Sequence, residues 1–236
     1  MQHPKKNEIK PHLSRYWKIP PEHDAEFVAR MEDILDVYER PYDPHRPVVC
    51  VDESFKQLVG EVRVPIPMSP GQSVRIDDEY ERKGIAEIFM AVEPLAGKRR
   101  VEVTATRTRR DWAEFIRRLV DEDYADAEKI ILVQDNLNIH STASLYEAFP
   151  AAEARRIAQR LELHYTPKHG SWLNIAEIEL SVYKRQCIPG RIDSIERMQE
   201  RTRIWNEGRN TRQTKVDWQF RTADARVKLR RRYPSL

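Results

Sequence analysis

Two aspartates in the sequence follow short apolar runs that are typical of buried strands. Asp52 ends the run VVCVD, and Asp135 ends the run IILVQD. Ligands bind at the carboxyl ends of strands in α/β sheets, and neighbouring strands lie about 4.8 Å apart, so these two carboxylates can share a divalent cation. Oxygen ligands without a nearby His or Cys cluster favour Mg²⁺ or Mn²⁺ over Zn²⁺. For either aspartate taken alone, an ordinary turn residue is the favoured alternative.

A third acid comes from the stretch TPKHGSWLNIAEIELS, which carries both Glu177 and Glu179. On a helix, residues two apart are separated by about 200°, so only one of these glutamates can face the two aspartates. Glu177 lies beside an apolar stripe, whereas Glu179 lies nearer the opposite face. The preference for Glu177 is small, because the segment is apolar on more than one side. The stripe consists of Trp172, Leu173, Ala176 and Leu180.

The elements that must position these acids follow from periodicity and turn residues. A helix is predicted over residues 25–41, followed by a buried strand over residues 46–54. A loop through MSPGQ and DDEYERKG then leads to two strand-like runs, residues 84–94 and 99–106, joined by the turn AGK. Two such runs across a short turn indicate an antiparallel hairpin. With the first strand they predict an antiparallel group of three.

The rest of the chain alternates between helical and strand patterns. Asp111 is the predicted cap of the first helix, and Pro150 is expected to interrupt the second. Strand, helix, strand and helix at this spacing predict right-handed crossovers and a partly parallel sheet. The expected elements are a helix over residues 111–124, a strand over 129–136, a helix over 143–161 and a strand over 161–167.

Composition indicates a single globular α/β domain. The chain has 236 residues, 40% of them hydrophobic, and a net charge of only +3, so contacts to nucleic acid must come from local clusters of Arg and Lys. No apolar run approaches the roughly 20 residues that cross a membrane, and no signal peptide is evident. Two distant cysteines, Cys50 and Cys187, argue against a disulfide framework or a zinc site. A cytoplasmic protein without membrane partners is expected.

Three motifs together resemble the catalytic domain of insertion-sequence transposases of the mariner superfamily. These motifs are VCVDES, ILVQDN followed by NIHS, and TPKHGSWLN followed by AEIELS. The resemblance spans nearly the whole chain. It implies an α/β, RNase H-like mixed sheet, with three antiparallel strands and then parallel strands, flanked by helices.

The resemblance also implies a site and a reaction. In this family the glutamate after the LN-x-x pattern is the third catalytic acid, which corresponds to Glu177. Asp52, Asp135 and Glu177 would then hold two Mg²⁺ (or Mn²⁺) ions, one for the attacking water or 3′-hydroxyl and one for the leaving oxygen. The implied activity is that of a DDE endonuclease and strand transferase. It would cut double-stranded DNA at transposon ends and join them to target DNA, usually at a TA dinucleotide.

Several polar residues are candidates for contacts to DNA or for auxiliary functions. Charge runs are more often solvated faces, and a lone loop histidine is more often solvated than functional. Asn136 either orients a metal-bound water or caps its loop, and Glu53 is expected on the opposite sheet face as a surface acid. The candidate DNA contacts are Lys98, Arg99, Arg100, Arg107, Arg109, Lys168, His169 and Ser171, and the auxiliary candidates are Asn136 and His140.

The expected organisation has three parts: an N-terminal arm and linker helix over residues 1–45, the DDE core over 46–189, and a basic helical extension over 190–236. Trp205, Trp218 and Phe220 are the predicted packing anchors of the extension. The resemblance implies a homodimer that bridges two DNA ends, a nucleoid-associated location, and a separate N-terminal helix-turn-helix domain as a partner.

Two other functions remain open from the sequence. The chain would alternatively be a catalytically idle DNA-binding or dimerising remnant that regulates a full-length transposase. An RNase H-like nuclease acting on RNA–DNA hybrids explains the third motif and the C-terminal part less well.

Overall fold

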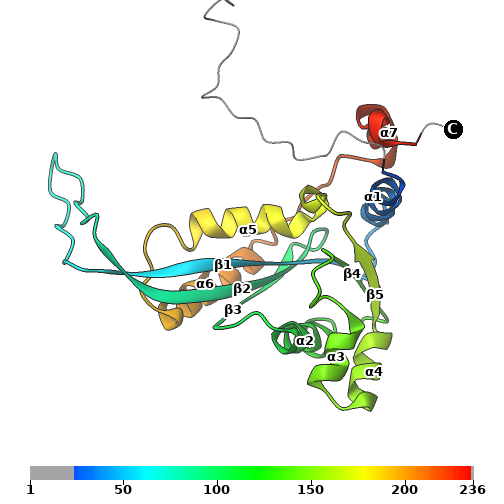
Figure 1. Cartoon of the computed structure of the whole chain (residues 1–236), viewed down its shortest axis with the longest axis horizontal. Helices are drawn as coiled ribbons and strands as arrows, with labels where there is room; N and C mark the ends of the chain where they lie inside the picture. Colours follow the sequence, from blue (N-terminus) through cyan, green and yellow to red (C-terminus); the bar gives the residue numbers. More distant parts are fainter. Residues whose placement is uncertain (1–23, 235–236) are drawn as a thin grey trace, which may run out of the picture.

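The computed structural model describes residues 24–234, which form a five-stranded mixed sheet with helices on both faces (Figure 1). The strand order is β3-β2-β1-β4-β5. The first three strands are antiparallel, and β4 and β5 run parallel to β1, which confirms the predicted sheet. The strands are β1 (Val48–Glu61), β2 (Tyr80–Glu93), β3 (Lys98–Thr104), β4 (Ile130–Gln134) and β5 (Leu161–Tyr165).

Helices form a layer on each side of the sheet. One face is covered by α2 (Arg109–Arg118), α3 (Thr142–Ala148) and α4 (Ala151–Gln159). The other is covered by α1 (Ala25–Tyr38), α5 (Ile175–Gln186), α6 (Ile195–Thr211) and α7 (Thr222–Lys228). Short helical turns complete the chain: a π-helical turn at Leu119–Asp123, and 3₁₀ turns at Ser171–Leu173 and Arg230–Arg232.

Alternation along β1 divides the core between the two faces. Val49 and Val51 pack against the α2–α4 layer, and Cys50 packs in the cluster of α1 and α5. Because side chains of a strand alternate between the faces of a sheet, Asp52 follows Cys50 toward α5, and Glu53 follows Val51 toward the α2–α4 layer. The core therefore determines which acid faces which helices.

The hairpin of β1 and β2 is longer than predicted and extends away from the helical layers (Figure 1). Pairing continues to Glu61 and Tyr80, with an irregularity between Gln57 and Val59. The expected strand over residues 46–54 was too short, and part of the expected loop at 77–84 is strand. Residues 80–85 of β2 are exposed and lack the buried alternation by which strands are recognised. In β1, Leu58 is buried in the cluster of α5 and α6, and the Val59 N–H donates to the Ile192 carbonyl at 2.7 Å, so contacts to the segment after α5 also hold the extension.

One predicted helix boundary was wrong and another was confirmed. Thr108 caps α2 and forms a reciprocal capping box with Asp111, so the prediction that Asp111 is the cap was wrong. Both residue types accept backbone N–H groups, and the sequence offered two candidates three positions apart. Pro150 does interrupt the next helical segment, because α3 ends at Ala148 and α4 begins at Ala151.

The C-terminal segment packs onto the core as predicted. Trp205 lies against the cluster of α5 and α6, and Trp218 and Phe220 lie against the cluster of α1 and α5. The expected extended arm before residue 24 lies outside the described residues. Between residues 24 and 234, no helix is long and apolar enough to cross a membrane.

A buried charge cluster attaches α5 to its neighbours. Glu179 is 1% exposed, and its carboxylate accepts hydrogen bonds from Arg99 Nε of β3 at 2.6 Å and from Arg209 Nη2 of α6 at 2.8 Å. Two guanidinium groups on one buried carboxylate satisfy its lone pairs. The cluster therefore joins a strand and two helices through a single side chain.

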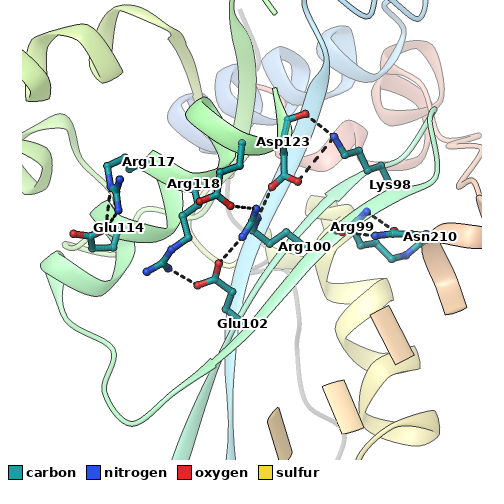
Figure 2. Close-up of polar contacts among 10 residues, drawn as sticks. Lys98, Arg99, Arg100, Glu102, Glu114, Arg117, Arg118, Asp123 and Asn210 are labelled. Atoms are coloured by element: carbon teal, nitrogen blue, oxygen red, sulfur yellow. Dashed lines mark hydrogen bonds and ion pairs between the residues drawn. The ribbon is translucent and has the colours of Figure 1, made fainter. Parts of the chain in front are cut away.

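The position of Arg99 contradicts its prediction as a DNA contact. Its side chain is buried, because α6 covers the hairpin turn: Asn210 accepts from the backbone N–H of Arg99 and donates to its carbonyl. Figure 2 shows Arg99 beside Asn210, and Arg100 between Asp123 and Glu102. Lys98 also bonds the Asp123 carbonyl. Arg99 and Arg100 therefore connect structural elements, whereas the Lys98 side chain is 40% exposed and its prediction as a DNA contact stays open.

We expect Glu179→Gln to lower the free energy of unfolding by about 3–5 kcal/mol, because it leaves two buried guanidinium groups without their anion. Urea unfolding monitored by circular dichroism measures this change. Glu200→Gln, which removes an exposed glutamate paired with Arg203 on α6, is the matched control and should have little effect. Equal stabilities of the two variants would contradict a structural function for the cluster.

Candidate active site

Asp135 directly follows β4, and Asp52 lies within the adjacent parallel strand β1, two residues beyond the last residue that pairs with β4. In the β1–β4 register Cys50 is opposite Val133, and each aspartate follows two residues later in its own strand direction. Val133 and Cys50 belong to the same core cluster, so the alternation directs both aspartates toward the α1 and α5 side. This is the adjacency that a shared cation requires.

Glu177 faces the same region from the first turn of α5. Asn174 caps this helix by accepting from the Ala176 N–H at 3.1 Å, and its amide donates to the Val51 carbonyl at 2.8 Å. One buried side chain therefore fixes the start of α5 against the residue that precedes Asp52. Glu177 is exposed in a groove of about 320 Å³, while Glu179 points into the buried cluster.

The same groove contains two residues that the sequence reasoning did not single out. Ser181 and Lys184 line it together with Asp52 and Glu177. They follow Glu177 at spacings of four and seven residues, which places all three on one helix face. The sequence shows this spacing, but it points to Ser181 and Lys184 only once Glu177 is taken as the third acid.

Negative charge accumulates around Asp52. Burial, together with the nearby carboxylates of Glu53, Glu177 and Asp135, raises the pKa of Asp52 to about 7 against the opposing effect of a hydrogen bond from the Glu53 backbone. That N–H donates to Asp52 Oδ1 at 2.8 Å. A carboxylate group whose charge is disfavoured in this way is stabilised in its ionised form by a cation.

Asp135 has a different electrostatic environment. Burial alone would raise its pKa, but hydrogen bonds from His140 and from the Leu137 N–H, with the positive charges of His140 and Arg107, hold the pKa of Asp135 below its ordinary value. Its Oδ1 lies 2.7 Å from His140 Nδ1 and accepts from Leu137 N at 3.0 Å. Asp135 is therefore ionised where Asp52 resists ionisation.

His140 connects Asp135 to Glu53. The second ring nitrogen, Nε2, lies 2.8 Å from Glu53 Oε1, and the side chains of His140 and Glu53 are 0% and 2% exposed. Burial lowers the pKa of His140, but its two carboxylate partners outweigh this effect and raise it to about 10. Glu53 does lie on the face opposite Asp52, but its prediction as a surface acid was wrong, because the histidine lies too far away in sequence to be recognised as its partner.

A second cavity, of about 630 Å³, borders Asp135 on its other side. Asn136 helps to form it: its Oδ1 accepts from Arg30 of α1 at 2.8 Å, and its Nδ2 donates to the Thr166 carbonyl at 2.7 Å. The predicted candidates Lys168, His169 and Ser171 all line this cavity.

The loop that carries these residues is tightly folded. His169 has a positive φ of 63°, and a Cβ at Gly170 would approach the Pro167 side chain to 2.4 Å. Non-glycine residues in this conformation carry strain and concentrate at functional sites. This uncommon backbone conformation therefore fixes Lys168 and His169 at the cavity.

The remaining predicted basic contacts lie near the α2 end of the sheet. Arg107 is 3.7 Å from Glu87 and its charge lowers the pKa of Asp135, and Arg109 pairs with Glu147. Both are partly exposed, unlike Arg99. Their prediction as DNA contacts stays open.

The donor set is suited to a hard divalent cation. Asp52, Asp135 and Glu177 supply only carboxylate oxygens, the ligands that Mg²⁺ and Mn²⁺ prefer. Among residues 24–234, no group of three or more His, Cys, Asp or Glu side chains already converges on one point. The chemistry of the three acids and the raised pKa of Asp52 fit a cation.

Residues 47–199 match the family described as DDE superfamily endonuclease. The match covers more than half of the chain, which therefore belongs to this family of endonuclease domains. No curated protein sequence matches the chain.

Solved structures of the Mos1 mariner transposase have the same RNase H-like fold. The paired-end complex with Mn matches at a TM-score of 0.54 and 15% identity, over 88% of this chain and 63% of that one. The Mos1 strand transfer complex matches at 0.53 and 16%, over 86% and 62%. The chain thus spans less than two thirds of these proteins, and the similarity shows the fold.

We expect Asp52 to make the metal-free protein less stable as the pH rises. Its folded pKa of about 7 exceeds its ordinary value of 3.8, so between these values the folded state binds more protons than the unfolded state, and stability falls until about pH 7. Asp52→Asn should therefore raise Tm at pH 8 in EDTA by about 2–6 °C and change it little at pH 4.

Differential scanning calorimetry across this pH range measures the effect. Asp126→Asn, at an exposed position, is the control for loss of one negative charge. A Tm of Asp52→Asn that equals that of the wild type at pH 8 would contradict the electrostatic cost assigned to Asp52.

Proposed function

We propose that this chain is the catalytic domain of a transposase, which cleaves DNA at transposon ends and transfers the cut strand into target DNA. The observation that carries the proposal is the arrangement of three acids in a DDE-family endonuclease domain. Asp52 within β1 and Asp135 after β4 lie just beyond the paired part of two adjacent strands, and Glu177 faces Asp52 across a groove. The Mos1 structures of the same fold include a paired-end complex and a strand transfer complex.

In this proposal Asp52, Asp135 and Glu177 hold two Mg²⁺ or Mn²⁺ ions. When bound, such ions activate the attacking oxygen and stabilise the leaving oxygen of an in-line phosphoryl transfer. The chain's own contribution is to orient these ligands. Asn174 fixes the start of α5 beside β1, and Glu53 N–H and His140 each bond one oxygen of an aspartate.

The proposed DNA contacts lie on both sides of Asp135. Lys168, His169 and Ser171 face one cavity, and Ser181 and Lys184 face the groove of Asp52 and Glu177. Basic side chains that follow a groove bind the phosphate backbone and give salt-dependent affinity rather than sequence specificity. Arg107 and Arg109 extend this proposed surface.

The larger assembly is part of the same proposal. Residues 46–189 would be the catalytic core, residues 1–45 an N-terminal arm and linker helix, and residues 190–236 a basic helical extension. A homodimer would bring two transposon ends together, and a separate helix-turn-helix domain would supply recognition of the terminal repeats. Nucleoid-associated action in the cytoplasm follows from DNA as the substrate.

We expect Glu177→Gln to lower the rate of Mn²⁺-dependent nicking of a labelled duplex with a candidate transposon end by roughly 10²–10³-fold, because it removes a ligand worth several kcal/mol. Asp135→Asn should have a similar effect. Glu196→Gln is the matched control, since this exposed glutamate lies in the first turn of α6 as Glu177 does in α5. Full activity of Glu177→Gln would overturn the assignment, and an inactive wild type that still binds Mn²⁺ would favour the catalytically idle alternative.

A second prediction concerns DNA affinity. Lys184→Ala should lower the slope of log K against log salt concentration by about one, because it removes one phosphate contact. Arg185→Ala removes the same charge from the neighbouring exposed position, turned about 100° around the helix, and should leave the slope unchanged. Fluorescence anisotropy with a short duplex measures both, and equal slopes for the two variants would exclude a track along this face of α5.

A further inference from the structure

Glu53, His140 and Asp135 form a continuous chain of hydrogen bonds through the sheet edge. Glu53 Oε1 lies 2.8 Å from His140 Nε2, and His140 Nδ1 lies 2.7 Å from Asp135 Oδ1 and 3.1 Å from the Asp135 backbone carbonyl oxygen. The glutamate comes from β1 on the face opposite Asp52, and the histidine comes from the loop that follows β4. The chain thus links Glu53, the neighbour of the proposed metal ligand Asp52, with Asp135, a second proposed ligand.

We propose that Glu53 and His140 are a positioning pair that fixes the Asp135 carboxylate with Oδ1 held and Oδ2 presented to the metal ion. This inference rests on the proposed function. Asp135 Oδ1 receives both the imidazole and the Leu137 N–H, which lies at 3.0 Å. Within residues 24–234, Oδ2 has no hydrogen bond, so it is the oxygen free to bind a cation.

The imidazole ring is itself held from several directions. The ring lies against the ring of Trp112, with centroids 5.9 Å apart. The backbone carbonyl of His140 accepts a hydrogen bond from Tyr165 Oη at 2.9 Å. With carboxylates at both nitrogens, the charged ring donates on both sides. A ring fixed at Nε2 by Glu53 cannot turn away from Asp135, although the Asp135 side chain is 43% exposed.

A purely structural function would give a different result. The chain offers a matched control in His164 of β5, whose Nδ1 lies 2.7 Å from Asp33 Oδ2 and whose Nε2 lies 3.1 Å from Glu162 Oε1. This histidine also bridges two carboxylates, but neither is a proposed metal ligand. Loss of either histidine should change stability, whereas only loss of the His140 bridge should change metal affinity.

The variants at position 140 separate the two ends of the bridge. Asparagine places its amide nitrogen near the position of Nδ1, so His140→Asn can still donate to Asp135 but cannot reach Glu53. Glutamine places its amide near Nε2, so His140→Gln reaches Glu53 but leaves Asp135 without the bond. Glu53→Gln keeps the shape of the partner and removes its charge.

The experiment measures Mn²⁺ binding by isothermal titration calorimetry without DNA, with Tm and nicking rates measured in parallel. We expect His140→Gln to weaken Mn²⁺ binding by about 10–100-fold, the usual effect of losing a hydrogen bond to a metal ligand. His140→Asn should restore affinity to within about threefold of wild type, because the bond to Asp135 is kept. Glu53→Gln should weaken binding by a smaller factor, and His164→Gln should leave it unchanged.

Asp135→Asn distinguishes the two levels of the proposal. If it loses Mn²⁺ affinity while folded His140→Gln and Glu53→Gln bind as the wild type does, the positioning pair is overturned and the proposed site stands. If Asp135→Asn itself binds Mn²⁺ like the wild type, the site assignment and the positioning pair both fail. Should His140→Gln not fold, Glu53→Gln decides, since wild-type affinity in that variant contradicts the inference.

Discussion

Repulsion among carboxylates is the constraint on which this structure depends. Asp52 lies near Glu53, Asp135 and Glu177, and burial together with these charges raises its pKa to about 7. A folded chain tolerates such a group only when packing elsewhere outweighs its cost. Asp52 belongs to β1, the central strand, whose residues Val49 and Val51 are fully buried against the helices. The acids are thus placed where the sheet is best able to hold them.

The surrounding elements affect the two aspartates differently. His140 supplies a positive charge between Glu53 and Asp135, which keeps the pKa of Asp135 low, whereas no positive charge is among the causes that shift the pKa of Asp52. The pKa values of the two aspartates therefore shift in opposite directions.

Helix α5 shows how two similar residues acquire different functions. Asn174 fixes its first turn to β1, and Glu179 fixes its body to Arg99 and Arg209. With the start and the buried face both held, the helix cannot rotate, and Glu177 must face the groove. The separation of about 200° between the two glutamates makes one an anchor and leaves the other available to a substrate or an ion.

The sequence alone predicted the mixed sheet, with its antiparallel group of three and its parallel crossovers, because strand and helix periods and turn residues are local properties. The function of the three acids stays a prediction. The sequence failed at Arg99 and Glu53, since Glu179 and His140, the partners that neutralise them, lie 80 or more residues away. It also missed the extension of β1 and β2, because residues 80–85 of β2 are exposed and show no buried alternation. Local pattern therefore determined which elements form, and only the tertiary structure decided which charged side chains are neutralised, because ion pairing depends on contacts between segments far apart in the chain.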